Sequence, residues 1–172
     1  MEAIGQTATH VVITGGEPML PVHIVELTRQ IRSRDMHITI ETAGTVFREV
    51  DCDLMSISPK MVNSIPSVSR AGGWSEKHDR VRQSSDLVQR LIDRHDYQLK
   101  FVVQNEQDID ELCKYCDALS ELDDSKVLLM PEGVELASLQ EKEAWLKPLC
   151  EARGFTFCPR MHIQWYGNKR GT

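Results

Sequence analysis

The stretch His10-Val11-Val12-Ile13-Thr14-Gly15-Gly16-Glu17-Pro18 places a short apolar run directly before a glycine pair and a carboxylate. The helical pattern begins only at Pro21, so Thr14 to Pro18 occupy a junction between a strand and a helix. Ligands of parallel α/β proteins bind outside the carboxyl ends of the strands. The stretch therefore predicts a ligand site, and a tight turn with a surface Glu17 is the plainer alternative.

Further strands are predicted to end in polar residues in the same way. The second strand runs into Glu41-Thr42-Ala43-Gly44-Thr45, the third ends in Ser58-Pro59-Lys60, and the fifth ends in Pro131-Glu132-Gly133. The predicted strands cover residues 10–13, 37–40, 53–57, 97–103, 126–130 and 155–158. The helices are predicted over 21–34 with Pro21 in the first turn, over 76–95, after an Asn105 cap, and from a Ser138-x-x-Glu141 capping box to Gly154.

Strands that alternate with helices at this spacing indicate parallel βα units with right-handed crossovers. Five or six units are too few for an eight-fold barrel. We therefore expect an α/β fold, a partial parallel (β/α) barrel, as one domain over residues 1–172.

Composition narrows the classes of function. A net charge of -6 gives no general attraction to nucleic acid or to an anionic membrane surface. Because no apolar run is long enough to span a bilayer and the first ten residues do not resemble a signal peptide, we expect a cytoplasmic protein. The five cysteines are an odd number, which favours reduced thiols.

Three other features have a structural and a chemical interpretation. Cys113 and Cys116 lie one turn apart on the apolar stripe of a predicted helix, which favours core packing over a metal site. The histidines lack the spacing of a metal-ligand motif. Residues 61–80, with Trp74, predict a long loop that acts as a lid.

The strand-end motifs, taken together with the ending Arg160-x-His162-x-x-Trp165-x-Gly167, resemble one group of enzymes. The chain is similar to the radical S-adenosylmethionine superfamily and, within it, to the family of 7-carboxy-7-deazaguanine synthases of queuosine biosynthesis. The similarity runs from about His10 to the last residue and rests on the order of the motifs at successive strand ends.

The resemblance implies a fold and a chemistry. The fold is the partial barrel of the radical SAM type. A 4Fe-4S cluster, reduced by a partner such as flavodoxin, cleaves S-adenosylmethionine, and the resulting radical abstracts hydrogen from the pterin substrate, 6-carboxytetrahydropterin. A ring contraction that needs Mg follows.

The resemblance also implies roles for residues of this chain. Gly16 and Glu17 would hold the methionine amino group of S-adenosylmethionine, and Ser58, Pro59 and Lys60 would line its ribose and carboxylate. Its adenine would lie beside Met130, Pro131, Glu132 and Gly133. The pterin would meet Thr14 and Glu41, and its carboxylate would meet Arg160, His162 and the C-terminal carboxylate of Thr172. A structural ion pair between Glu41 and Lys60 is the plain alternative for those two residues.

The chain departs from the family pattern at one point. The family needs three cysteines in a loop upstream of the Gly-Gly-Glu-Pro motif, and here only residues 1–9 precede the first predicted strand. We therefore expect a truncated member that lacks the first strand, the cluster cysteines and the nearby Mg-binding hydroxyl, and that is inactive as given. The exposed edge left by that strand predicts a homodimer or poor solubility. The alternatives are a glycyl-radical activating enzyme and a cluster-free binding or scaffolding domain.

Overall fold

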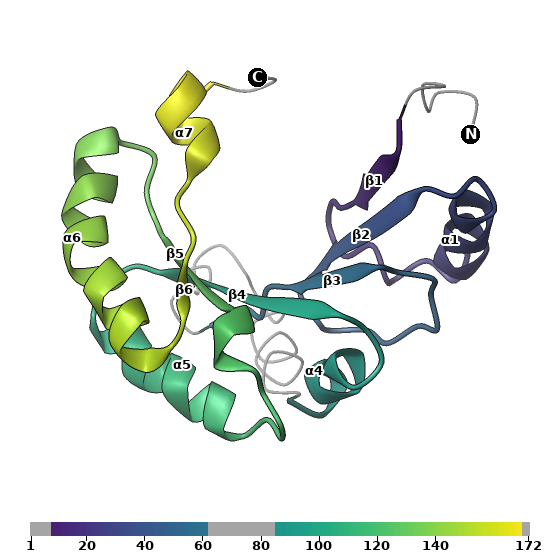
Figure 1. Cartoon of the computed structure of the whole chain (residues 1–172), viewed down its shortest axis with the longest axis horizontal. Coiled ribbons are helices and arrows are strands. Elements are labelled where there is room, and N and C mark those ends of the chain that lie inside the picture. Colours follow the sequence, from purple (N-terminus) through teal and green to yellow (C-terminus); the bar gives the residue numbers. More distant parts are fainter. Residues whose placement is uncertain (1–7, 62–84, 170–172) are drawn as a thin grey trace, which may run out of the picture. The chain divides into compact units, whose positions relative to one another are not determined.

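The computed structural model describes residues 8–61 and 85–169, and the chain divides into two compact units (Figure 1). The first unit is Met1–Pro59 with Glu76–Gln98, and the second is Lys60–Ser75 with Leu99–Thr172. The expected lid with Trp74 and the C-terminal Thr172 lie outside the described residues. The expectation of one domain over 1–172 stays a prediction.

The first unit is built from parallel strands and two described helices. Its elements are β1 (His10–Ile13), α1 (Ile24–Arg32), β2 (His37–Thr42), β3 (Leu54–Ile57), α4 (Ser85–Ile92) and the first residues of β4 (Tyr97–Val103). β2 pairs in parallel with β1 and with β3, in a register that aligns Ile13 with Ile40 and Glu41 with Ser56. The Met55 amide donates to the Asp96 carbonyl, which joins the approach to β4 to β3.

Apolar residues of α1, α4 and the strands form the core of this unit. The helix α1 packs against β2, and α4 packs against β3. Ile24, Thr28 and Ile31 are the buried residues of α1, at the spacing of one helix face. In the strands Ile38, Ile40, Met55 and Ile57 are fully buried. Burial of these side chains is the main term that holds the strands and helices together.

The second unit continues the alternation of strands and helices. Its elements are the rest of β4, α5 (Gln107–Asp117), the 3-10 helix η3 (Asp124–Lys126), β5 (Val127–Pro131), α6 (Leu136–Arg153), β6 (Thr156–Phe157) and α7 (Met161–Tyr166). β5 pairs in parallel with β4 and with β6. Every second residue of β4, from Tyr97 to Val103, is buried, as expected for a strand with one face packed on helices.

The hydrogen-bonded order of the strands is β1-β2-β3-β4-β5-β6, which is also their order along the sequence. Every pairing that the structure describes between these strands is parallel. This arrangement confirms the predicted α/β class with parallel βα units.

Several element ends differ from the predictions. α1 begins at Ile24 and not at Pro21, because turns closed by the Glu17 and Pro21 carbonyls come first. The capping box was wrong: α6 begins at Leu136, so Ser138 lies inside its first turn. Asn105 precedes the assigned cap of α5, yet its side-chain oxygen accepts the Gln107 amide at 3.0 Å.

The prediction left the tail without regular structure, and there the structure forms α7. For the helix predicted over 76–95, the structure describes α4 from Ser85 only.

Candidate ligand site at the carboxyl ends of the strands

The ends of β1 and β2 meet through a hydrogen bond between two side chains. The hydroxyl of Thr14 donates to Oε2 of Glu41 at 3.0 Å. The register aligns Ile13 with Ile40, so the next residue of each strand, Thr14 and Glu41, faces the same side. The structure thus brings together the two first-unit residues that the resemblance assigned to the pterin.

Glu17 connects the loop after β1 to the loop after β2. Its Oε1 accepts from the Thr42 hydroxyl at 2.7 Å and from the Met19 amide at 3.1 Å. Its Oε2 accepts from the Ala43 amide at 3.0 Å and from the Thr45 hydroxyl at 3.2 Å. The carboxylate of Glu17 is therefore held by donors of the protein itself.

The glycines of these loops adopt left-handed backbone conformations. Gly15 and Gly16 have φ of 100° and 55°, and a Cβ on either would meet nothing within 4 Å. Their need for glycine therefore arises from backbone conformation, and they border open space. Gly44 differs, because a Cβ there would lie 2.7 Å from Val88 Cγ2 and 3.0 Å from Ile57 Cγ2.

The Ser58-Pro59-Lys60 motif follows β3 directly. The Ser58 amide donates to the Thr42 carbonyl at 2.8 Å, which extends the pairing of β2 and β3 beyond the strand ends. Pro59 is buried and is the last residue of the first segment of the first unit, whereas Lys60 is exposed and belongs to the second unit.

The loop after β5 is held by two cations of the second unit. Lys142 Nζ donates to the Glu132 carbonyl and lies 3.3 Å from Glu132 Oε2. Arg160 Nη1 donates to the Gly133 carbonyl at 2.9 Å, while its buried Nε has no partner among the described residues. Pro131, the last residue of β5, is buried. Arg160, assigned by the resemblance to the pterin carboxylate, thus contacts the loop assigned to the adenine.

His162, the other described tail residue assigned to the pterin, is exposed on α7. Met130, the first residue assigned to the adenine, pairs with Val102 of β4.

Two polar contacts near these residues were missed by the sequence analysis. Gln98 Nε2 donates to the buried Ser56 hydroxyl at 2.8 Å, and Ser56 is the register partner of Glu41. Lys142 was missed because it lies within a helix and not at a strand end. The available signal for Ser56 was a polar residue within the apolar run of β3, since strands of buried parallel sheets are usually apolar throughout.

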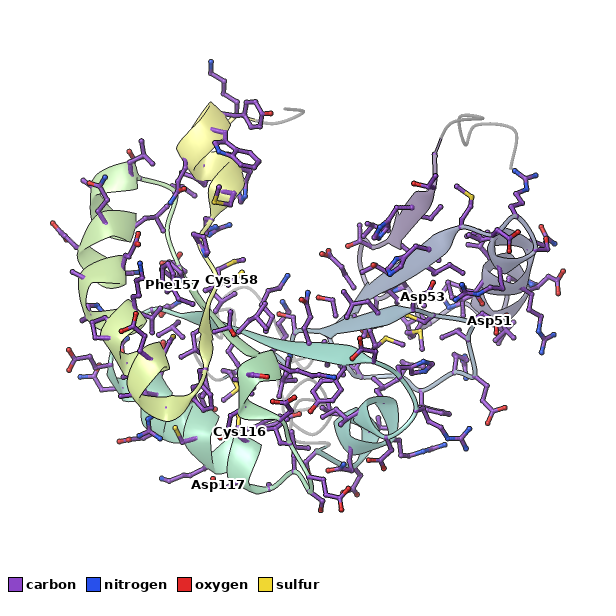
Figure 2. The ribbon with its side chains drawn as sticks, in the orientation of Figure 1. Asp51, Asp53, Cys116, Asp117, Phe157 and Cys158 are labelled. Carbon is purple, nitrogen blue, oxygen red and sulfur yellow. The ribbon has the colours of Figure 1, made fainter. Side chains whose placement is uncertain are left out.

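The cysteines of this chain do not fit an iron-sulfur cluster. All five are free and described, and they lie before β3, in α5, in α6 and after β6. Figure 2 labels Cys116 on α5 and Cys158 after β6. Burial raises the pKa of Cys116 to about 12 and of Cys52 and Cys150 to about 11, which disfavours the thiolate that binds iron.

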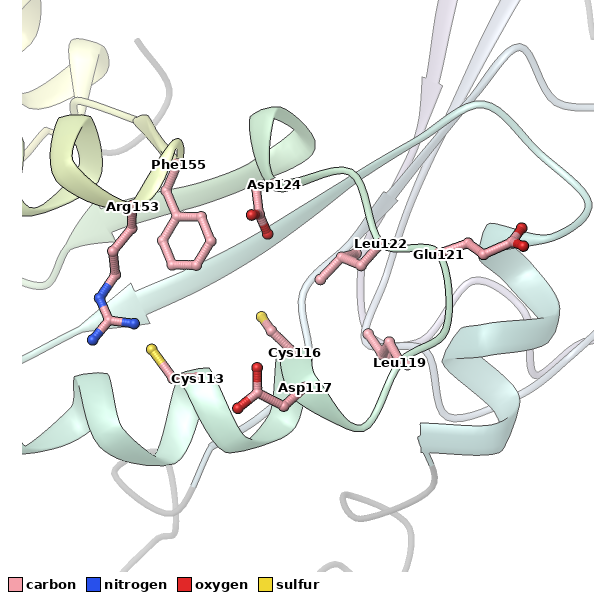
Figure 3. Close-up of a pocket in the computed structure, with 9 residues that line it drawn as sticks. All are labelled: Cys113, Cys116, Asp117, Leu119, Glu121, Leu122, Asp124, Arg153 and Phe155. Atoms are coloured by element: carbon pink, nitrogen blue, oxygen red, sulfur yellow. The ribbon is translucent and has the colours of Figure 1, made fainter.

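Cys113 and Cys116 line a cavity of about 390 Å³ together with Arg153 and Phe155 (Figure 3). The cavity lies where α5 leads towards β5 and α6 leads towards β6, at the amino ends of these strands. Within residues 8–61 and 85–169, no group of three or more His, Cys, Asp or Glu side chains is arranged to hold a metal ion.

Parallel βα units with polar loops after β1, β2, β3 and β5 define the class of protein as an α/β fold consistent with a partial parallel (β/α) barrel. Comparison with a solved structure supports this fold. QueE from Escherichia coli superposes with a TM-score of 0.57 at 23% identity, over 90% of this chain and 57% of that chain. No family profile matches the sequence.

Curated relatives make the assignment more specific. The chain is 40% identical to the 7-carboxy-7-deazaguanine synthase of Rhodopirellula baltica over 95% of this chain and 63% of that protein. It is 34% identical to the enzyme of the same name from Halobacterium salinarum over 91% of this chain and 64% of that protein. The chain is thus a homologue of proteins named 7-carboxy-7-deazaguanine synthase. It spans less than two thirds of the length of these two relatives.

Proposed function

We propose that this chain is the S-adenosylmethionine- and pterin-binding part of an enzyme of the 7-carboxy-7-deazaguanine synthase type. Such an enzyme converts 6-carboxytetrahydropterin to 7-carboxy-7-deazaguanine. The observation that carries the proposal is the contact of Thr14 with Glu41 at the carboxyl ends of β1 and β2. Homologues of that name share 40% and 34% of their aligned residues with this chain, which supports the same substrate class.

The proposed roles follow the strand ends. The loop with Gly16 and Glu17 serves the methionine amino group, and Ser58, Pro59 and Lys60 serve the ribose and carboxylate. The adenine lies beside the segment from Met130 through Pro131 and Glu132 to Gly133. Thr14 and Glu41 meet the pterin ring, and Arg160, His162 and Thr172 meet its carboxylate. The guanidinium of Arg160 suits the pterin carboxylate, and the carboxylate of Glu41 suits the pterin ring. Hydrogen bonds with a charged partner are stronger than those between neutral groups.

The radical step requires ligands that these 172 residues do not supply. A 4Fe-4S cluster with an open iron needs three neighbouring thiolates, and the five cysteines here are dispersed, with burial opposing their ionisation. We therefore propose that the chain binds both small molecules and performs no radical chemistry on its own. We also propose that the whole enzyme needs magnesium for the ring contraction.

Isothermal titration calorimetry with S-adenosylmethionine and with 6-carboxytetrahydropterin tests the proposal directly. We expect saturable binding of both ligands. Absence of pterin binding would contradict the proposed substrate and would favour a glycyl-radical activating enzyme or a scaffolding domain. Anaerobic reconstitution with iron and sulfide is expected to leave the protein without visible thiolate-to-iron absorption.

The setting of the enzyme is also part of the proposal. Within residues 8–61 and 85–169, no helix has the length and apolar composition needed to cross a membrane. We place the protein in the cytoplasm, with a reductant such as flavodoxin for the whole enzyme. β1 stands at the end of the strand order and Val12 is 52% exposed, which supports a homodimer formed through this edge. Light scattering after gel filtration measures the oligomeric state.

A further inference from the structure

We propose that Glu17 is a positioning residue, whose carboxylate fastens the loop after β2 to the loop after β1. It shapes the amino-group site and does not itself accept a hydrogen bond from the ligand. The inference rests on the proposed function and deepens it. It distinguishes a Glu17 that accepts a hydrogen bond from the ligand from a Glu17 that positions the loops around the ligand.

The hydrogen bonds of Glu17 fill its acceptor capacity. An ionised carboxylate offers about four lone-pair positions on its two oxygens. Four donors already occupy them, at 2.7 and 3.1 Å on Oε1 and at 3.0 and 3.2 Å on Oε2. A ligand ammonium would have to displace one of these donors and leave it without a partner, which opposes the exchange.

Three of the four donors come from one short segment that begins at the last residue of β2, namely Thr42, Ala43 and Thr45. The Thr42 hydroxyl is buried and also accepts the Gly44 amide at 3.0 Å. Gly44 in turn has no room for a Cβ. The segment is therefore packed tightly, and Glu17 connects it to the loop after β1 through three hydrogen bonds, beside a longer contact of 3.4 Å from Arg48 to the Leu20 carbonyl.

The arrangement leaves the ligand to groups other than the Glu17 carboxylate. Gly15 and Gly16 are exposed, and a Cβ on either would project into open space. Glu17, by contrast, is half-buried between the two loops. Both loops flank the Thr14 and Glu41 contact, so a change in their separation would alter the site without removing any ligand contact.

Glu17→Gln and Thr45→Val test the inference. Both weaken the connection, and Thr45→Val does so without altering the carboxylate. We expect the Ala43 amide of the ligand-free protein to exchange with solvent at least about tenfold faster in Glu17→Gln, and measurably faster in Thr45→Val. Glu26→Gln, which makes the same chemical change on the exposed face of α1, serves as the control and is expected to leave exchange unchanged.

S-adenosylmethionine affinity is measured on the same variants. We expect it to fall in both Glu17→Gln and Thr45→Val, and we expect the wild-type Ala43 amide to stay protected when the ligand binds. A direct acceptor role predicts the opposite pattern. Affinity would fall in Glu17→Gln only, Thr45→Val would bind as well as or better than the wild type, and the Ala43 amide would lose protection on binding.

The two readouts separate failure of this inference from failure of the proposed function. If the wild-type chain binds no S-adenosylmethionine, the proposed function is wrong, and amide exchange still decides whether Glu17 fastens the loops. If the ligand binds and Ala43 exchange is unchanged in Glu17→Gln, the positioning role is wrong and the proposed function stands.

Discussion

Thr14 donates a hydrogen bond to Glu41 at 3.0 Å, so the residue that follows β1 fixes the carboxylate near the end of β2. Replacement of Glu41 by Gln removes the charge and keeps the shape of the side chain. We expect Glu41→Gln to weaken pterin binding about tenfold or more, because hydrogen bonds to a charged group contribute about 1.5–3 kcal/mol. S-adenosylmethionine affinity is expected to change by less than about twofold. Calorimetric titration with each ligand measures both.

The control for that prediction is Glu49→Gln. Glu49 is exposed and pairs with Arg94 at 3.7 Å, so the substitution removes the same charge from the surface. An equal loss of affinity for both ligands in Glu41→Gln would show that Glu41 supports the fold of the loops and does not contact the pterin.

The cations behind the loop after β5 lead to a second prediction. Lys142→Met and Arg160→Lys each remove a donor to a carbonyl of this loop, and the second substitution keeps the positive charge. We expect each to weaken S-adenosylmethionine binding several-fold while the thermal midpoint changes little. Lys147→Met on the exposed face of α6 is the matched control. Unaltered affinity in both variants would show that this loop does not contact the ligand.

Gly44→Ala is expected to destabilise the protein by about 3 kcal/mol or more, since it combines a left-handed backbone with a clash. The added Cβ would lie 2.7 Å from Val88 Cγ2. Gly154→Ala separates the two contributions, because Gly154 has φ of 74° and an added Cβ would make only an ordinary 3.7 Å contact. It is expected to cost about 1–2 kcal/mol. Urea denaturation measures both, and equal losses would contradict the clash.

Asp53 predicts how stability depends on pH. Burial acts to raise the pKa of Asp53, but hydrogen bonds from Arg32 at 2.8 Å and from the Ile38 amide at 2.6 Å outweigh it and lower the pKa. The stabilisation is therefore present above the ordinary carboxyl pKa and is lost as the pH falls towards the lowered pKa in the folded state. We expect Asp53→Asn to cost about 1–2 kcal/mol at neutral pH and progressively less in acid.

Denaturant unfolding between neutral and acidic pH tests this prediction. Asp51→Asn is the control, because Asp51 is exposed two residues away (Figure 2). A constant difference in stability between wild type and Asp53→Asn at all pH values would contradict the ionic origin of the contribution.

The buried thiols are expected to react slowly. Because burial raises the pKa of Cys116 to about 12 and of Cys150 to about 11, the thiolate fraction at mildly alkaline pH is very small. Alkylation with iodoacetamide, followed by mass spectrometry, is expected to modify these residues only after unfolding. Rapid modification of Cys116 in the native protein would show that α5 opens locally.

The sequence predicted the repeating units of the fold well, because each has its own local signal. β4 was predicted with its observed bounds, since its alternating apolar residues and the turns that flank it are local features. The start of α6 was predicted wrongly, because Ser138 and Glu141 fit the capping pattern although both lie inside the helix. α7 was missed because its short apolar content lacks a clear helical period.

The candidate site was predicted only in part, because some of its contacts follow from local sequence signals and others depend on the folded structure. The pairing of Thr14 with Glu41 follows from two strand ends and a register, which the pattern of the chain indicates. The four bonds of Glu17 and the contact of Gln98 with Ser56 depend on tertiary geometry. A sequence can show that a carboxylate follows a glycine pair, but it cannot show which donors will reach it.

The strand order has a consequence for how the protein is made. Each strand from β2 onward pairs with the strand that precedes it in the sequence. During synthesis on a ribosome the partner of each strand from β2 to β6 has therefore already emerged, and none of these described strands must wait for a later one to form its first ladder. Growth of the sheet can then keep pace with translation, which shortens the time that unpaired strand edges are exposed to other nascent chains.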